Sequence, residues 1–231
     1  MYLTSSEKNE KLQLKNNFIV MSVVMHPGYF LNLLNFAVLA QRDIIWEVSG
    51  NYQKQSFRNR CHIANDRGFH TLSIPIKHNG KSKGRNTYAD VLIDNKYAWQ
   101  RQHWRTLQTA YRTSPFFEFY EDEIAVLYNQ EYKSLLDFNL KTIEIACDCL
   151  QIEMPSAKTA IFHKTLDKKE TEGRTLIDAK KTAPVAFTPY VQVFDDRNGF
   201  IENLSILDLL FNEGTNALSY LQEIPLDFLD A

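Results

Sequence analysis

The chain contains little cysteine, glycine or proline for its length. Its 231 residues include three Cys, eight Gly and seven Pro. So few cysteines, in odd number, exclude a disulfide framework, and the scarcity of glycine and proline excludes collagen-like and low-complexity chains. Apolar runs such as residues 18–25 are much shorter than the roughly 18–20 residues that span a bilayer. The composition, with 44% hydrophobic and 23% charged residues, is that of an ordinary globular protein with enough length for one core.

Several common functional motifs are missing as well. The sequence has no G-x-x-x-x-G-K-[ST], no G-x-G-x-x-G and no G-x-S-x-G. Its histidines and cysteines lack the spacing of zinc ligands, so we predict no metal site, and no cofactor can be identified. Residues 1–16 are polar and lack the apolar stretch of a signal peptide, so we expect a flexible leader and a cytoplasmic protein.

The order of apolar patterns predicts an α/β fold. An apolar run over 18–25, the turn His26-Pro27-Gly28, helical spacing over 29–42 and a second run over 43–48 predict a βαβ unit. We expect a mixed sheet flanked by helices, with a helical middle section, in a single domain covering 17–231. The further predicted elements are strands over 56–64, 69–76, 88–93 and 185–194, helices over 96–113, 116–129, 134–151, 204–212 and 215–224, and an extended, flexible connection over 153–183.

Basic residues are concentrated between residues 51 and 112. This stretch holds twelve Lys and Arg against three Asp, in a chain whose formal charge is −2, and it includes four of the six histidines. Part of it is a polar, basic loop over 78–87, which we expect to be mobile. A local charge of this size is typical of a surface that meets phosphate, carboxylate or an acidic partner.

The helix predicted over 96–113 carries the densest group of candidate residues. Arg101 and Arg105 are spaced to share one helix face, and His103 lies near Trp99 in the same segment. One interpretation makes the two arginines anion contacts and His103 an acid/base group, because imidazole titrates near neutral pH. The alternative puts the aromatic residues in the core, with His103 hydrogen-bonded beside them.

A second group of candidates lies on the strand predicted over 56–64. Alternation would direct Arg58 and Arg60 to one face, where they could clamp a carboxylate or phosphate, or could be part of a solvated sheet face. Asn59 and Cys61 would point to the apolar side. A buried Asn59 amide needs a hydrogen-bond partner. Cys61 is either an activated thiol beside the arginines or a small buried hydrophobe.

His26 ends the first predicted strand. Open α/β sheets bind ligands at the carboxyl ends of their strands, so His26 is a candidate substrate-binding residue. The turn shares His26 and Gly28 with the H-x-G-H turn of nucleotidylyl transferases, but Tyr29 replaces the second histidine, so we infer no ATP binding.

The chain resembles the WbqC-like family. The resemblance is carried by HPGYF at 26–30, QKQSFRNRCHIA at 53–64, LSIPIK at 72–77 and NLSILDLLFNEG at 203–214. Its most specific part is VLIDNKYAWQRQHWRTLQTAYRTSPFFEFY at 91–120. Members of the family are encountered among genes for O-antigen and other surface polysaccharides. The resemblance therefore implies a role in modifying an amino sugar, such as transfer of an acyl or aminoacyl group.

Together these features predict a transferase acting on an anionic sugar nucleotide, with an acyl carrier protein as a possible acidic partner. His103 would accept a proton from the attacking amine or hydroxyl. The alternative is a noncatalytic protein whose basic face over 51–112 docks an acidic partner, whereas nucleic acid is not an expected ligand. The predicted anion contacts are Arg58, Arg60, Lys77, Arg101 and Arg105, and the residues that orient the substrate are Asn59, Tyr111 and Gln192.

Overall fold

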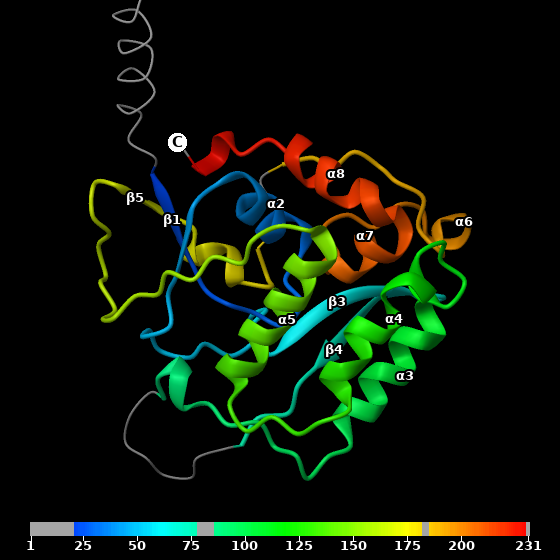
Figure 1. The fold of residues 1–231 in the computed structure, drawn as a ribbon, viewed down its shortest axis with the longest axis horizontal. Helices are drawn as coiled ribbons and strands as arrows, with labels where there is room; N and C mark the ends of the chain where they lie inside the picture. The colour runs from blue at the N-terminus through cyan, green and yellow to red at the C-terminus, as the bar shows by residue number, and fades with distance from the viewer. Residues whose placement is uncertain (1–20, 78–85, 182–184, 230–231) are drawn as a thin grey trace, which may run out of the picture.

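A parallel three-stranded sheet opens the fold (Figure 1). β1 (Ser22–Met25) lies in its centre, between β2 (Ile44–Trp46) and β5 (Glu170–Glu172). The helix α2 (Leu33–Gln41) connects β1 to β2, which confirms the predicted βαβ unit and the α/β class. The chain is seen here in a computed structural model that describes residues 21–77, 86–181 and 185–229. The predicted leader and residues 78–85 of the predicted mobile loop lie outside the described residues.

The composition of β1 explains its central position. Val23, Val24 and Met25 are at most 1% exposed, as expected for a strand covered on both faces. Asn32 caps the helix that follows, because its side-chain oxygen accepts a hydrogen bond from the Asn35 amide at 3.1 Å. The cap at Asn32 thus fixes where the connection after β1 ends and α2 begins.

β5 lies within residues 153–183, which the sequence predicted to be an extended connection. Glu170–Glu172 instead pair in register with Ser22–Val24, and the 3₁₀ helix η3 (Arg174–Ile177) follows directly. Gly173 makes this possible, since a Cβ there would lie 2.5 Å from Val23 Cγ1. This part of the segment therefore belongs to the central sheet.

A β-hairpin forms the second sheet. β3 (Arg60–Asn65) and β4 (Gly68–Ser73) pair antiparallel, so the parallel and antiparallel strands lie in separate sheets. The prediction that β3 starts at residue 56 is wrong, because residues 57–59 form a turn in which the Asn59 amide donates to the Ser56 carbonyl at 3.4 Å. Arg58 and Arg60 therefore do not share a strand face.

Helices cover the two sheets. Figure 1 shows α3, α4 and α5 beside the hairpin and α2, α7 and α8 grouped at the other end of the molecule. The expected start of α3 at residue 96 is wrong, because the helix begins at Trp99, after Ala98. The remaining helices are α3 (Trp99–Tyr111), α4 (Phe117–Ala125) with η2 (Val126–Tyr128), α5 (Leu135–Leu150), α6 (Asp195–Asn198), α7 (Ile206–Glu213) with η4 (Gly214–Asn216), α8 (Ala217–Glu223) and η5 (Asp227–Leu229).

Two predicted strands are absent from the described chain. Residues 88–93 contain the 3₁₀ helix η1 (Tyr88–Asp90) and only isolated bridges, and residues 185–194 join no ladder. Both segments bury every second or third side chain, such as Tyr190 and Gln192, without pairing to a neighbouring strand. They are half-buried, as strands are, but their backbones do not form a ladder.

Gly28 sits where the turn after β1 meets the turn before β3. Its neighbour Tyr29 donates its amide to the Phe57 carbonyl at 2.8 Å. A Cβ on Gly28 would lie 2.4 Å from Leu31 Cδ2 and 2.8 Å from the same carbonyl oxygen. The close approach of the two turns therefore requires glycine.

Gly28→Ala should lower the free energy of unfolding by about 1–3 kcal/mol, the usual cost of forcing extra atoms into a packed site. Urea unfolding followed by circular dichroism measures the loss. Gly50→Ala is the matched control, because its Cβ would first meet the half-exposed Phe162 ring at 3.1 Å. Equal losses in the two variants would show that the close approach of Gly28 to the Phe57 carbonyl does not contribute to the loss of stability.

Candidate functional site

A cavity of about 560 Å³ lies at the carboxyl ends of the parallel strands. His26 follows β1 directly, and residues 50–54 come shortly after β2. Ligands of open α/β sheets bind at this edge. We call this cavity the anion chamber; its lining residues are His26, Gly50, Asn51, Tyr52, Gln53, Lys54, Arg58, Phe162 and Lys164.

A second chamber of about 350 Å³ adjoins the first. The two share His26, Gln53 and Phe162 as lining residues, so His26 lies at their junction. The second chamber carries charges of both signs, since it is also lined by Glu172, Arg174, Thr175, Ile177, Asp178 and Lys181. Among the described residues, in contrast, three cations and no carboxylate line the anion chamber.

Arg58 is the most unusual residue of the anion chamber. Its side chain is 1% exposed, Nη1 donates to Ser56 Oγ at 3.4 Å, and Nε has no hydrogen-bond partner. Throughout the described part of the chain, carboxylates pair with Lys141 and Arg174 but not with Arg58. Burial lowers the pKa of Arg58, and the nearby Tyr88, Tyr52 and Glu47 only partly oppose this effect, since no carboxylate of the described chain forms an ion pair with the guanidinium. An unpaired buried guanidinium is rare unless a ligand supplies the anion.

Two residues from other elements position Arg58 against the turn after β1. The Asn139 amide of α5 donates to the Arg58 carbonyl at 2.6 Å and also to the Tyr88 hydroxyl. That hydroxyl donates to the Pro27 carbonyl at 2.9 Å, and the Tyr88 ring lies 5.2 Å from the guanidinium carbon. The ring face adds a cation–π interaction. Arg58 and His26 are thus held near one another by a buried framework.

His26 has a defined proton position. Its ring is 7% exposed, and Nδ1 lies 3.0 Å from the Glu47 carbonyl oxygen. Because a carbonyl only accepts, Nδ1 carries the proton and Nε2 keeps a free lone pair in the neutral ring. Burial, followed by the charge of Arg58, lowers the pKa of His26 to about 3.

Glu47, which was not singled out from the sequence, holds the loop after β2 that lines the anion chamber. The side chain is 1% exposed, and Oε1 accepts hydrogen bonds from the Ser49 amide, the Gly50 amide and Thr159 Oγ1 at 2.8, 3.0 and 3.0 Å. A glutamate directly after a buried strand and three residues before a glycine was the available signal. Its role is to fix the loop that lines the chamber.

Arg174 builds the wall of the second chamber. It pairs with Glu172, donates to the His163 carbonyl at 2.6 Å and lies 5.3 Å from the centre of the Phe162 ring. Its charge is therefore already compensated, unlike that of Arg58. The loop that carries Phe162 and Lys164 is fastened to the end of β5 by these contacts.

His103 lies in the core, not in either chamber. Its Nδ1 is 2.9 Å from the Tyr29 hydroxyl, and Trp99 packs edge-on against the ring. Burial lowers the pKa of His103 to about 4. Arg101 and Arg105 lie on the exposed face of the same helix, so the structure does not bring the three residues together. This environment matches the core alternative for the helix.

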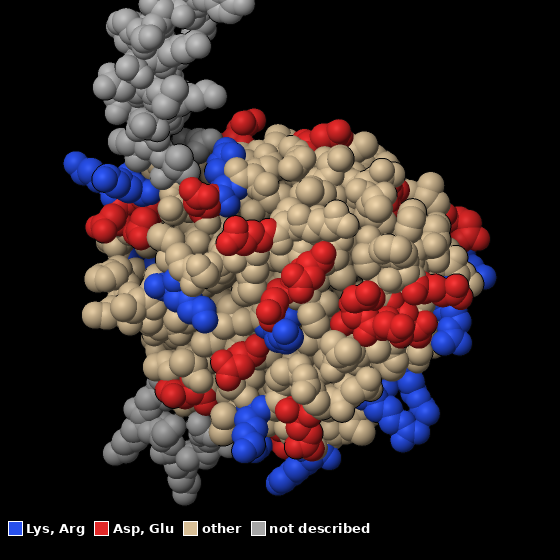
Figure 2. All heavy atoms as spheres, in the orientation of Figure 1, with Lys and Arg blue, Asp and Glu red and all other residues tan. Residues whose placement is uncertain are grey.

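The structure does not gather the other predicted contact residues in the anion chamber. Lys77 is exposed, and Arg60 is partly exposed at the start of β3, with a buried Nε that has no hydrogen-bond partner in the described chain. Asn59, predicted to orient the substrate, donates to the Ile74 carbonyl at 3.0 Å. In Figure 2 the acidic side chains gather over α4 and α5, and basic side chains lie along the lower rim of that face. Among the described cations of the basic stretch, Lys54 and Arg58 line the anion chamber, whereas Arg101 and Arg105 lie on the exposed face of α3.

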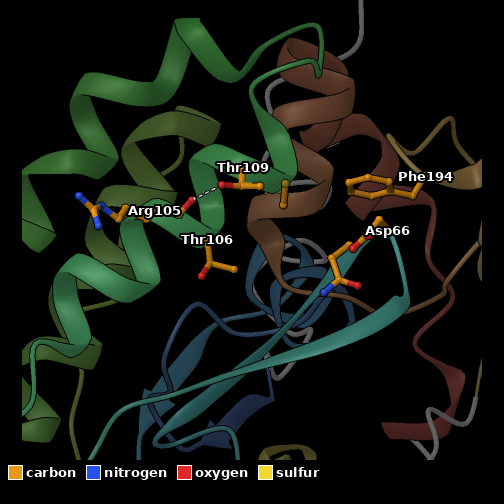
Figure 3. Close-up of a pocket in the computed structure, with 7 residues that line it drawn as sticks. Asp66, Arg105, Thr106, Thr109 and Phe194 are labelled. Atoms are coloured by element: carbon orange, nitrogen blue, oxygen red, sulfur yellow. Dashed lines mark hydrogen bonds between the residues drawn. The ribbon is translucent and has the colours of Figure 1, made fainter.

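Arg105 borders a separate groove of about 490 Å³ between α3 and the hairpin turn. Figure 3 shows its side chain pointing away from Asp66 and Phe194, which line the same groove. Thr106 and Thr109 of α3 lie between them. The groove therefore lacks a convergent anion site.

Tyr111 and Gln192 are brought together by a residue that the sequence did not identify. Asp208 of α7 is fully buried and accepts hydrogen bonds from the Tyr111 hydroxyl at 2.8 Å, the Tyr190 hydroxyl at 2.5 Å and the Gln192 amide at 2.8 Å. This network joins α3, α7 and residues 190–192. No residue of the network lines the two chambers.

Volume alone does not select the site. A groove of about 700 Å³ at the amino ends of β1 and β2 is larger, but each charged residue lining it is at least partly exposed.

Cys61 is buried, and burial raises the pKa of its thiol, so it is an unreactive core residue. Searching residues 21–77, 86–181 and 185–229 gives no grouping of three potential metal ligands.

Comparison with known proteins identifies a matching family and a related sequence. The sequence model of the WbqC-like protein family matches residues 27–184. The chain is also 27% identical over 202 residues to an uncharacterized protein of Mycobacterium tuberculosis, Rv1507c, covering 74% of this chain and 84% of the relative. No solved structure matches. Within the described part, no helix has the length and apolar character needed to cross a bilayer.

Proposed function

We propose that this chain, which belongs to the WbqC-like protein family, transfers an acyl or aminoacyl group to a nucleotide-linked amino sugar used for a surface polysaccharide. The diphosphate of the acceptor would occupy the anion chamber. The setting in polysaccharide synthesis and the nature of the transferred group rest on the family resemblance. The choice of an anionic substrate rests on the structure of the chamber.

The observation that carries this proposal is the buried, unpaired Arg58. Removing a cation from water costs several kcal/mol when no partner compensates it. A phosphate oxygen at Nε would supply the missing acceptor, and planar guanidinium groups bind phosphate through paired hydrogen bonds. Lys54 and Lys164 add positive charge at the exposed side of the chamber.

The size and aromatic walls of the chamber suit the rest of a sugar nucleotide. Its volume of about 560 Å³ is within the range of pockets that bind small molecules. Tyr52 and Phe162 line it, and the Tyr52 ring lies 6.3 Å from that of Tyr88. Aromatic faces of this kind pack against sugar rings and bases while polar groups fix the phosphate.

Isothermal titration calorimetry with pyrophosphate, UDP, UDP-N-acetylglucosamine and uridine tests the proposal. We expect the three phosphate-bearing compounds to bind and uridine not to bind. At 100 times its dissociation constant, a ligand should stabilise the fold by about 2.7 kcal/mol, which thermal unfolding detects. Absence of binding by all three phosphates would overturn the proposal.

The exposed arginines of α3 favour a second function, docking of an acidic protein such as an acyl carrier protein. Arg101 and Arg105 are solvent-exposed and form no ion pair with any carboxylate in the described chain. Docking through exposed charges weakens steeply with salt, because the screening length falls to about 8 Å at physiological ionic strength. The double variant Arg101→Gln/Arg105→Gln should abolish such docking and leave pyrophosphate binding unchanged.

A further inference from the structure

His26 is placed to contact a ligand that extends from the anion chamber into the second chamber. Of the residues that the structure describes, it is the one charged or titratable residue that lines both of them. The hydrogen bond from Nδ1 to the Glu47 carbonyl fixes the ring and leaves Nε2 as an acceptor. A second hydrogen-bonded group that orients a histidine is the usual companion of a catalytic base.

The charge of Arg58 opposes protonation of this ring. Arg58 lowers the pKa of His26 beyond the effect of burial, and Arg174 contributes less in the same direction. Next to these two cations the imidazole is therefore a weak base at neutral pH. An anion bound to Arg58 would cancel the larger of the two repulsions, because opposite charges at close range favour the protonated form.

We propose, on the basis of the function above, that His26 accepts the proton in the transfer step and that phosphate bound at Arg58 enables it to do so. The amino group of the sugar attacks the carbonyl carbon of an acyl thioester, forming a C–N bond. The nitrogen gives its proton to Nε2 of His26. The C–S bond breaks with its electron pair on sulfur, and the imidazolium returns the proton to this thiolate. The products are an amide and a thiol.

Several other charged groups surround His26 and contribute to its protonation. The backbone carbonyl of Glu47 accepts the hydrogen bond from His26 Nδ1, and the Glu47 carboxylate accepts hydrogen bonds from three donors. The remaining charged groups that line the two chambers are Lys54, Lys164, Glu172, Asp178 and Lys181, in addition to Arg58 and Arg174. All of them are present in the experiment below, so only the bound anion changes.

The test is an NMR titration of His26 in the full chain labelled with ¹³C and ¹⁵N histidine. The His26→Gln variant assigns the signal. We expect the long-range ¹H–¹⁵N spectrum to show the proton on Nδ1. With saturating pyrophosphate, the midpoint should move up by about one pH unit, which is a tenfold gain in proton affinity. In Arg58→Met the midpoint should be raised already, and pyrophosphate should not shift it further.

Three outcomes would overturn the proposal: a proton on Nε2, no binding of pyrophosphate, or an unchanged midpoint when pyrophosphate is bound. If pyrophosphate binds without moving the midpoint, the proposed transferase stands and the role of His26 falls. If the midpoint moves but no amide forms from UDP-glucosamine and an acyl thioester, the coupling stands and the proposed function falls. In a working assay, His26→Gln should lose turnover and keep UDP-sugar binding within about threefold, a difference well under 1.4 kcal/mol.

Discussion

Replacing Arg58 with methionine should abolish diphosphate binding and raise the free energy of unfolding at the same time. Binding should weaken by at least 100-fold, about 2.7 kcal/mol, because the buried donor for the phosphate is removed. Stability should rise by about 1 kcal/mol or more, because a neutral side chain of similar length replaces an unpaired buried cation. Calorimetry and urea unfolding measure the two quantities on the same preparation.

The opposite signs distinguish a ligand-binding arginine from a structural one. A structural Arg58, held by Ser56 and Tyr88, would lose stability on replacement. Arg58→Lys keeps the charge but not the planar fork, so it should bind diphosphate less tightly than wild type and more tightly than Arg58→Met. The matched control is Arg105→Met, which changes an exposed arginine outside both chambers and should alter neither quantity. Loss of stability in Arg58→Met would contradict the assignment.

Replacing Asp208 with leucine should cost at least about 3 kcal/mol of unfolding free energy. The change leaves three buried donors, from Tyr111, Tyr190 and Gln192, without their acceptor. Each unsatisfied buried donor costs about 1–3 kcal/mol. Asp196→Leu on α6 is the control, because this aspartate is exposed. A loss below about 1 kcal/mol would mean that water or other side chains satisfy the donors.

The pH dependence of stability offers a separate check on Asp208. Burial raises its pKa above the usual 3.8, whereas in the unfolded chain the carboxyl keeps its ordinary value. Between the two values the folded state binds more protons, so the contribution of Asp208 is fully present at acidic pH and declines as the pH rises. The stability of wild type relative to Asp208→Asn should therefore fall between acidic and neutral pH. A constant difference would show that Asp208 titrates normally.

The sequence was most reliable where a pattern follows from burial of the backbone itself. The apolar run ending at Met25 predicted β1 and its parallel partner, because a strand covered on both faces needs apolar residues throughout. The helices α3 and α5 followed from their apolar stripes. Alternating segments were ambiguous, since residues 185–194 bury every second or third side chain against the core without forming a ladder.

The site was less predictable because it depends on residues that the fold brings together from far apart. Arg58 was identified as a candidate, but as half of a clamp with Arg60 on one strand face. Nothing in the local sequence shows that the strand starts at Arg60 and not at residue 56. Its burial beside His26 depends on Tyr88 and Asn139. His103 was identified from its titration range, yet its orientation is set by the Tyr29 hydroxyl. The catalytic role of His103 stays a prediction, and its ring lies in the core, outside both chambers.

The pairing of β1 with β5 has a consequence for the order of events during synthesis. Residues 22–24 emerge early and pair with β2 after a short crossover, but their other edge is completed only by residues 170–172. Until then the nascent protein exposes one open strand edge, which other chains can pair with. Arg174 and its contact with Phe162, which line the second chamber, also form only after residues 170–172 have been synthesised. Truncation before residue 170 should therefore leave the binding site incomplete and yield an aggregating fragment.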